Sequence, residues 1–141
     1  MGLLLFMAKT FSYGKEEKLK RRKLLEDIFS KGKTFTIHPV KVFYLQPTGK
    51  LDFPVKTGVG VSTKYFKKAV DRIRIKRLLR EAYRTKKIPL HEFLKANDRQ
   101  AIIFLLYVDR ELPDQSILKT KMGSIIERLI MHLNEKNPAN T

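Results

Sequence analysis

Apolar side chains recur at helical spacing in three segments of the chain. The first stripe ends at Phe29 and predicts an amphipathic helix over residues 18–31, stopped by Gly32 in the position where helices favour glycine. A second stripe runs through residues 64–87, and a third runs through residues 117–133. Each stripe leaves polar side chains on the rest of the helix surface, so we expect each helix to bury one face.

Four other segments carry the β-branched and aromatic residues that are typical of strands. Residues 34–37 and 40–46 predict two strands separated at Pro39, and residues 55–62 predict a third. Residues 101–108 are almost wholly apolar, as expected of a central strand buried on both faces. The third strand contains two glycines, which indicate either a bulge or the close approach of another backbone.

The element order that follows is α-β-β-β-α-β-α, with a further short helix expected over residues 89–96. It predicts an α+β fold, a single domain in which one layer of helices covers a four-stranded sheet. We place this domain at residues 15–134, between a flexible amino-terminal tail at residues 1–14 and a frayed end at residues 135–141. Met7 opens a plausible translation start, which makes the first six residues a candidate upstream extension.

Composition restricts the class of partner. Of the 141 residues, 43% are hydrophobic, which is typical of a globular domain rather than a disordered basic tail. The 30 lysines and arginines against 14 acidic residues give a net charge of +16, which indicates a polyanionic partner. No apolar run approaches the roughly 20 residues that span a bilayer, so we expect nucleic acid rather than a membrane. Cysteine is absent, and we expect a cytoplasmic protein.

The positive charge is concentrated in residues 64–87. They hold eleven basic residues against Asp71 and Glu81, so +9 of the +16 falls within 24 residues. On a helix, the apolar residues of this segment fall on one side, and no acidic residue interrupts the centre of the other. A polyanion would relieve the repulsion there, which favours a nucleic-acid surface over an ordinary solvated face. The basic residues expected on that side are Arg74, Lys76, Arg77, Arg80 and Arg84.

No catalytic site can be assembled from the sequence. His38, His91 and His132 are scattered, without the spacing of a zinc site. Asp109 and Glu111 follow the fourth strand, but no third ligand lies near them in the sequence, so we interpret them as part of a solvated turn. No pairing of a nucleophile with a general base stands out. If the chain takes part in catalysis, the chemistry belongs to something that it binds.

Three segments carry a pattern beyond charge and hydropathy. They are residues 69–81 (AVDRIRIKRLLRE), residues 58–64 (GVGVSTK) and residues 24–32, which end in Phe-Ser-Lys-Gly. In this order they resemble the signature helix, the strand before it and the first helix of the bacterial ribonuclease P protein subunit. That family's signature is Arg-Asn-Arg followed by an apolar residue, Lys and Arg. The resemblance covers about residues 18–134, and the element order deduced above is that of the family.

This resemblance implies a ribosomal-protein-like fold with a left-handed βαβ crossover, where general rules favour a right-handed one. It implies that the chain is the protein subunit of a ribonucleoprotein that removes the 5′ leader from precursor tRNA. Cleavage in that family is carried out by the RNA subunit, with Mg²⁺ bound mainly by that RNA. The implied partners are ribonuclease P RNA and precursor tRNA, with no DNA and no membrane. No catalytic or metal-binding residue is expected in this chain.

The family's binding residues carry over to two groups of positions. Contacts with the catalytic RNA are implied for the basic helix and the turn before it, at Lys67, Lys68, Arg72, Arg74, Lys76, Arg77, Arg80 and Arg84. A cleft between the first helix and the sheet is implied to hold the leader by stacking and charge, at Phe29, Phe43, Lys64 and Leu25. For the two phenylalanines, plain core packing is the alternative.

The chain departs from the family at particular positions. The middle Asn of the signature is Ile73, an apolar residue at the centre of the cationic side, which offers RNA only van der Waals contact. Leu25 stands where the family commonly has an aromatic residue, and residues 65–68 (YFKK) replace a glycine-containing segment. The surface for single-stranded RNA is therefore expected to differ in shape from the family's usual one.

Other functions fit parts of the same pattern. A structural ribosomal-type RNA-binding protein, with no role in cleavage, would share the charge, the fold class and the missing active site, but it needs no stacking cleft. A self-sufficient nuclease would need clustered acids or a histidine pair. A double-stranded DNA binder is disfavoured because the cationic side lacks the Asn and Gln side chains that read base edges.

Overall fold

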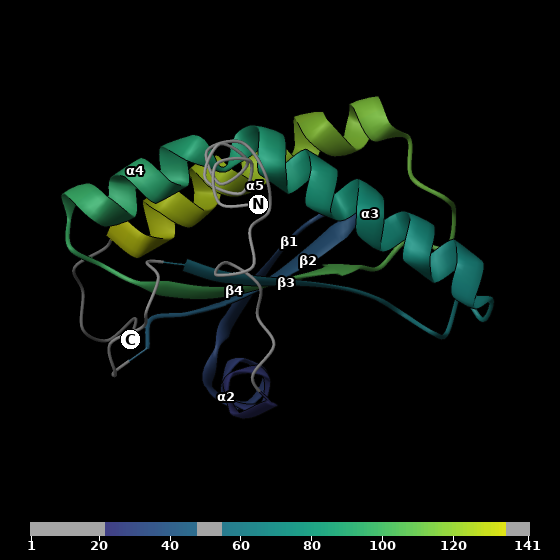
Figure 1. Cartoon of the computed structure of the whole chain (residues 1–141), viewed down its shortest axis with the longest axis horizontal. Coiled ribbons are helices and arrows are strands. Elements are labelled where there is room, and N and C mark those ends of the chain that lie inside the picture. Colours follow the sequence, from purple (N-terminus) through teal and green to yellow (C-terminus); the bar gives the residue numbers. More distant parts are fainter. Residues whose placement is uncertain (1–21, 48–54, 135–141) are drawn as a thin grey trace, which may run out of the picture.

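A four-stranded sheet with helices on both faces forms the protein (Figure 1). This computed structural model describes residues 22–47 and 55–134, with the side chains of the first helix described from Glu26 onward. The elements are α2 (Arg22–Lys31), β1 (Lys33–Ile37), β2 (Val40–Leu45), β3 (Val55–Val61), α3 (Ala69–Lys86), α4 (Ile88–Ala96), β4 (Ala101–Tyr107) and α5 (Gln115–Asn134).

The α+β class and the predicted element order are confirmed, with boundaries that shift by a few residues. The short helix expected over residues 89–96 is α4, which follows α3 directly, so two helices join β3 to β4. Several predictions lie outside the described residues. These are the start of the first helix, the tails at residues 1–14 and 135–141, and most of the loop between β2 and β3.

The strands follow the order β1-β2-β4-β3 across the sheet. β1 and β2 form an antiparallel hairpin that turns at a cis peptide bond between His38 and Pro39. β2 also pairs with β4 in the antiparallel direction, whereas β3 pairs with β4 in parallel along its whole length. Because parallel neighbours need a crossover connection, α3 and α4 carry the chain back over one face of the sheet.

The main core lies between the sheet and a layer made of α3, α4 and α5 (Figure 1). Because strand residues alternate between faces, β4 directs Ile103 and Leu105 into this core. On its other face Ile102 is buried, but Phe104 and Leu106 are partly exposed, so burial of β4 on both faces is confirmed only near its start. α5 closes the core with buried side chains at helical spacing, Leu118, Met122, Ile125, Ile126, Leu129 and Leu133.

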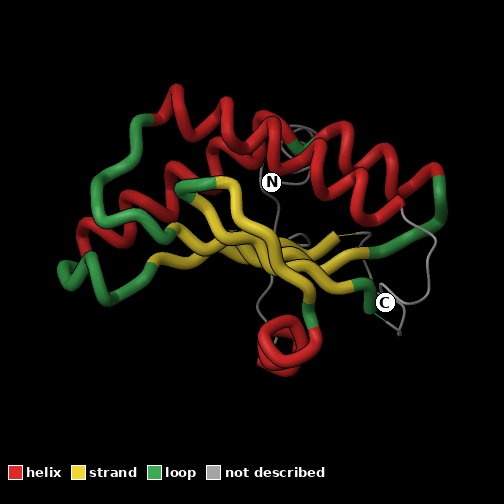
Figure 2. The backbone as a smooth tube through the Cα atoms, turned by 180° about the vertical axis from the view of Figure 1, so that it is seen from behind, coloured by secondary structure: helices red, strands yellow, loops and turns green. Residues whose placement is uncertain are grey.

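α2 lies on the opposite face of the sheet, which differs from the expected single layer of helices (Figure 2). Its buried Ile28 packs against Ile102 of β4. The turn from α2 into β1 requires the glycine predicted there. The Gly32 N–H donates to the Ile28 carbonyl at 3.0 Å, and a Cβ on Gly32 would lie 2.3 Å from that oxygen.

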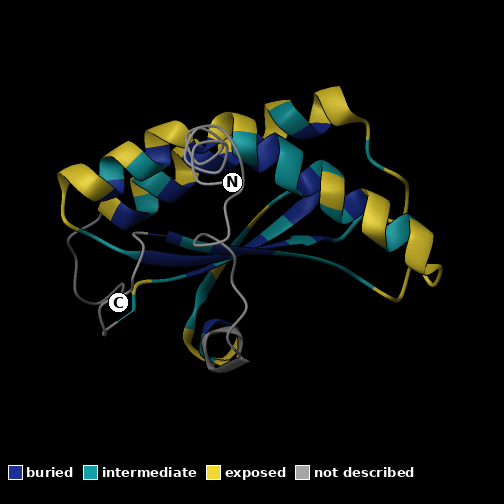
Figure 3. Cartoon of the chain, viewed as in Figure 1, coloured by how far each residue is buried: buried dark blue, intermediate teal, exposed yellow. Residues whose placement is uncertain are grey.

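α3 has the two sides predicted for it. Ile75, Leu79, Ala82 and Tyr83 are buried, with Leu78 partly buried beside them. Figure 3 shows the buried positions of α3 on the side toward the sheet and its exposed positions on the outer side. Burial of each large side chain contributes about 1.5–3 kcal/mol, whereas each pair of like charges on the other side costs only a few tenths. Burial therefore holds the helix together despite its charge.

A polar network crosses this otherwise apolar core. The Thr57 hydroxyl donates to the Tyr83 hydroxyl at 3.0 Å, and that hydroxyl lies 3.1 Å from Nε2 of His91. Burial, together with the nearby charges of Lys87 and Lys95, lowers the pKa of His91 from 6.5 to about 4. The imidazole is therefore neutral in the folded protein at pH 7, with one ring nitrogen available to accept a hydrogen bond.

We expect acid to destabilise the fold through His91. The pKa of His91 is about 6.5 in the unfolded chain and about 4 in the folded protein. Between these pH values the imidazole is protonated in the unfolded chain but not in the folded protein, so the free energy of unfolding falls as pH falls. The free energy of unfolding, measured by urea titration, should be roughly 1–2 kcal/mol lower at about pH 5 than at about pH 7. His91→Gln, which cannot titrate, should lose most of this dependence. If the free energy of unfolding of the variant falls as much between pH 7 and pH 5 as that of the wild type, groups other than His91 cause the pH dependence.

Candidate nucleic-acid interface

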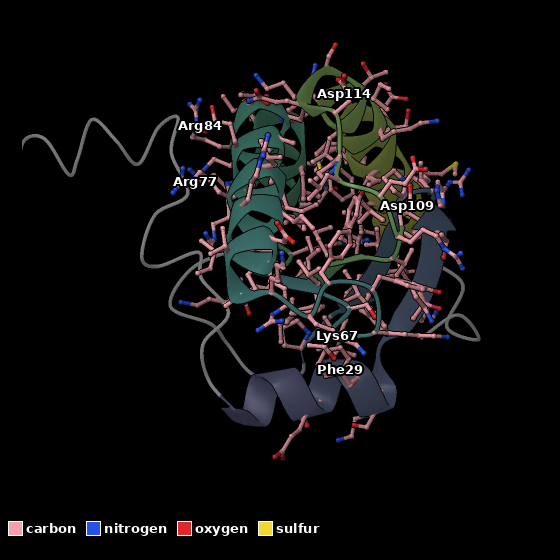
Figure 4. All side chains as sticks on the ribbon, turned by 90° about the vertical axis from the view of Figure 1, so that its right-hand side faces the viewer. Phe29, Lys67, Arg77, Arg84, Asp109 and Asp114 are labelled. Carbon is pink, nitrogen blue, oxygen red and sulfur yellow. The ribbon has the colours of Figure 1, made fainter. Side chains whose placement is uncertain are left out.

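The predicted cations of α3 lie on its outer side. Arg74 and Arg77 are exposed, and Lys76 and Arg80 are partly exposed. None of these four side chains has a hydrogen bond or ion pair within the described part of the chain. Figure 4 shows Arg77 and Arg84 projecting from the side of α3 that faces away from α5. This side of the helix therefore carries positive charge that the described protein does not neutralise.

Two of the predicted RNA-contacting arginines have partners within the protein. Arg72 donates through one guanidinium nitrogen to the carbonyls of Phe66 and Lys67, at 2.8 and 2.7 Å. Arg84 forms an ion pair with Glu81 one turn before it, and this hydrogen bond lowers the pKa of the Glu81 carboxyl. Arg72 thus holds the segment before the helix in place, and the charge of Arg84 is partly compensated.

An apolar spot lies among these cations. Ile73 is 56% exposed and Val70, one turn before it, is 76% exposed. Ile73 therefore lies outside the core, as expected from its place at the centre of the cationic side. The predicted Lys67 and Lys68 are also exposed, in the segment that leads into α3, so they extend the charge beyond the amino-terminal end of the helix.

Three phenylalanines meet between α2 and the sheet. Phe29 of α2 is 51% exposed, and its ring centroid lies 5.2 Å from that of Phe43 and 5.0 Å from that of Phe104, both edge to face. Phe29 lies on the side of α2 that faces the sheet (Figure 4). Nζ of Lys41 lies 5.2 Å from the centroid of Phe43. We call the three rings the aromatic triad; they are packed against one another yet still open to a ligand.

Phe104 is the member of the triad that the sequence analysis missed. It was hidden in the wholly apolar β4, which offers no alternation to mark an open face. The register places Phe104 beside Phe43 on one side and Gly58 on the other. The pairing of Phe43 with Phe104 across β2 and β4 could have indicated this site. That pairing can be recognised only once the strand order is known.

Gly60 makes room for this ring. β3 pairs regularly with β4, and the close approach to Gly60 is made by a side chain, so the expected bulge or neighbouring backbone is wrong at this position. A Cβ on Gly60 would lie 2.6 Å from Cζ of Phe104. The glycine thus lets the Phe104 ring lie over β3.

The other two predicted leader-binding residues are placed differently. Lys64 is exposed in the segment after β3, with its Nζ 5.5 Å from the ring centroid of Tyr65. Leu25 lies in α2, but its side chain is outside the described residues. The structure thus brings Phe29 and Phe43 together and associates Lys64 with a different aromatic ring.

Residues 22–47 and 55–134 contain neither a metal-binding cluster nor a membrane-spanning helix. In those residues no cluster of three or more His, Asp or Glu side chains is arranged to hold a metal ion. The helices described there include none with the length and hydropathy to cross a bilayer.

Known proteins match this chain over most of its length. The protein-family model described as Ribonuclease P matches residues 13–129. The ribonuclease P protein component of Porphyromonas gingivalis is 34% identical over 120 residues, which cover 85% of this chain and 88% of that protein. The component from Idiomarina loihiensis is 39% identical over 92 residues, which cover 62% of this chain and 70% of that protein.

Solved structures share the fold. The RNase P protein from Thermotoga maritima matches with a TM-score of 0.59 and 22% identity, over 79% of this chain and 98% of that one. A mutant RNase P protein from Staphylococcus aureus matches with a TM-score of 0.58 and 16% identity, over 92% of this chain and 96% of that one. At these identities the likeness concerns the fold alone.

Adding a methyl group at Gly60 should disturb the triad. We expect Gly60→Ala to lower the free energy of unfolding by about 1–3 kcal/mol, because the Phe104 ring must move out of its position. Gly123→Ala in α5 is the matched control: its Cβ would meet only the Lys86 side chain at 3.9 Å, so it should stabilise by about 0.5–1 kcal/mol. Urea unfolding measures both. Restored stability in Gly60→Ala combined with Phe104→Leu would identify the ring as the cause, and no change in Gly60→Ala would contradict the close contact.

Proposed function

The chain belongs to the ribonuclease P protein family, and on that premise we propose that it is the protein subunit of a ribonuclease P holoenzyme. In this role it binds the catalytic RNA and the 5′ leader of precursor tRNA, and so promotes the endonucleolytic removal of the leader that generates mature tRNA 5′ ends. The half-exposed aromatic triad is the observation that carries the proposal, because a scaffold protein needs phosphate contacts but no stacking surface for a free strand.

The outer side of α3 is the surface proposed for the catalytic RNA. Arg74, Lys76, Arg77 and Arg80 keep their charges unpaired within the described residues, and they repeat along one side of a helix. Each phosphate neutralised by such a side chain releases condensed counterions, which drives binding and makes it salt-dependent. Lys67 and Lys68 would extend the same contact, whereas Arg72 and Arg84 would contribute less because they already have partners.

The aromatic triad is the surface proposed for the leader. Unstacked bases of single-stranded RNA bind aromatic faces in a sequence-tolerant way, at about 1–3 kcal/mol per base. Phe29 presents its exposed face to solvent, while Phe43 and Phe104 hold it edge to face. The Lys41 ammonium beside Phe43 can pair with the phosphate of a stacked nucleotide.

The two surfaces belong to opposite faces of the sheet. α3 covers one face, and the triad lies on the other face, between the sheet and α2 (Figure 4). The protein can therefore contact both RNAs at once, and it would contribute affinity and alignment rather than chemistry. The bond cleavage itself is assigned to the RNA subunit, for which Mg²⁺ supplies the activated water in this family.

Removal of charge from α3 should weaken assembly with the catalytic RNA. With Arg74, Lys76 and Arg77 changed together to Ala, the plot of log affinity against log salt should lose about two units of slope, at up to ~0.9 per lost phosphate contact. Lys95, Lys121 and Arg128 changed together to Ala remove the same charge elsewhere and form the control. A fall in slope of the same size in both variants would mean that net charge alone matters and that α3 is only a solvated face.

Cleavage of precursor tRNA at low magnesium concentration tests the proposed function directly. Catalytic RNA alone, protein alone and the two together should give weak, absent and strong cleavage, respectively. An absence of enhancement by the protein would favour a structural ribosomal-type role, and cleavage by the protein alone would reveal a catalytic site within it.

In equilibrium binding measurements on the same holoenzyme, Phe43→Ala should weaken binding of precursor tRNA by about 1–3 kcal/mol and leave binding of mature tRNA unaffected, because only the precursor offers a base to stack. Phe35→Ala is the matched control, since Phe35 is a partly buried aromatic on the other face of the same sheet. Phe35→Ala should cost stability without changing the preference for precursor. Equal losses for precursor and mature tRNA in Phe43→Ala would contradict the leader site.

A further inference from the structure

Two cations from different loops approach the ring of Tyr65. Nζ of Lys64 is 5.5 Å from its ring centroid, and Cζ of Arg110, in the segment after β4, is 5.4 Å from it. The ring is 37% exposed. Within the described residues, the Tyr65 hydroxyl has no hydrogen-bond partner, and neither cation has a carboxylate partner. An aromatic face with two uncompensated positive charges is the combination that single-stranded nucleic acid binds, by stacking and by phosphate contact.

The acidic residues beside Arg110 are directed elsewhere. Asp109 and Glu111 line a cavity of about 320 Å³ at the β1–β2 turn, and Asp109 also lies 3.3 Å from Nε2 of His38. Arg110 does not line that cavity. Successive side chains of this segment therefore point in different directions. Asp109 and Glu111 lie toward the hairpin turn, and Arg110 lies over Tyr65, so its charge is available for an anionic ligand.

The segment that carries Tyr65 is held in place before any ligand binds. Ser62 N–H donates to the Tyr107 carbonyl at 3.4 Å, and the buried Phe66 ring packs 6.2 Å from the Tyr107 ring. Arg72 donates to two carbonyls of the same segment. A preformed surface loses little ordering entropy on binding, which favours a binding role.

This surface continues the face that carries the aromatic triad. In Figure 1 the segment between β3 and α3 dips to the side of the sheet where α2 lies. Tyr65 follows the end of β3, and Arg110 lies three residues beyond Tyr107 of β4. From Phe104 to Tyr107 the strand rises about 10 Å. Stacked bases rise about 3.4 Å each, so the triad and Tyr65 are at least a few nucleotides apart along a strand.

We propose that Tyr65, with Lys64 and Arg110, forms a second stacking site that holds one further nucleotide of the precursor-tRNA leader, several nucleotides along the strand from those at the triad. The site rests on the proposed function for its ligand, but not for its geometry. Tyr65 would stack on the base, and the two cations would contact the flanking phosphates. The leader would then be gripped at two points, which fixes its direction across the sheet.

The holoenzyme, assembled from the full chain and the catalytic RNA, provides the test. Precursor tRNAs carry a single abasic nucleotide at each leader position in turn, and equilibrium affinity is measured for wild-type protein, Tyr65→Ala and Phe43→Ala. In the wild type, two separate leader positions should each show a loss of roughly fivefold or more. Tyr65→Ala should abolish the sensitivity at one position only, and Phe43→Ala at the other.

Conservative and distant variants separate stacking from structure. Tyr65→Phe keeps the aromatic face and should retain the wild-type pattern, and Arg110→Ala should weaken binding without moving the sensitive position. Met131→Ala, an exposed apolar change on α5, should alter nothing. Thermal unfolding of each variant checks the fold. If no leader position loses its sensitivity in Tyr65→Ala, or if Tyr65→Ala weakens binding of the catalytic RNA instead, the second site is wrong.

Failure of this inference can be told apart from failure of the proposed function. If the wild-type holoenzyme binds precursor and mature tRNA equally, the leader role of the whole chain is wrong. If the wild type prefers precursor and Phe43→Ala loses that preference while Tyr65→Ala retains it, only the second stacking site is overturned, and the cations over Tyr65 then serve to join the two loops.

Discussion

The structure depends on the position of β4 between β2 and β3. A strand with neighbours on both sides and apolar residues on both faces must be covered twice. α3, α4 and α5 cover the face that bears Ile103 and Leu105, and α2 covers the part of the other face around Ile102. Because α2 spans only that part, Phe104 remains partly open. The incomplete covering of one strand thus creates the aromatic triad on one side of the sheet, while the crossover that β3 and β4 require puts the cationic helix on the other.

The charge of α3 is tolerated because its stability comes from its buried side. Four side chains of the helix are buried. In the described structure, Glu81 and Arg84 form the ion pair that joins two residues of α3. Surface ion pairs contribute little, so their scarcity costs the helix little. The unpaired cations remain as stored repulsion, which a polyanion relieves on binding. The residues that stabilise α3 and the cations that we propose to bind RNA therefore lie on opposite sides of the same helix.

Close contacts decide the shape of the sheet face that carries the aromatic triad. Gly60 lets the Phe104 ring lie over β3, and Phe29 completes the triad from α2. At the end of the same strands, Arg72 fixes the segment that carries Tyr65. This segment is where the chain departs from the family pattern, and Ile73 and Val70 form an exposed apolar spot nearby on α3. Among these departures, Tyr65 and Ile73 are exposed on the surface, whereas Phe66 is buried in the main core.

The sequence by itself determined the elements, their order, the two sides of α3 and the family, because helical and strand periodicity and the signature helix are local properties of the chain. It also indicated Phe29 and Phe43, through the family resemblance. The tertiary structure alone decided that α2 lies on the opposite face from α3, that Phe104 joins the triad, and that Arg72 is occupied by backbone carbonyls. It also paired Tyr65 with Arg110, forty-five residues away in the chain. These facts depend on strand order and on contacts between distant residues, which periodicity along the chain does not encode.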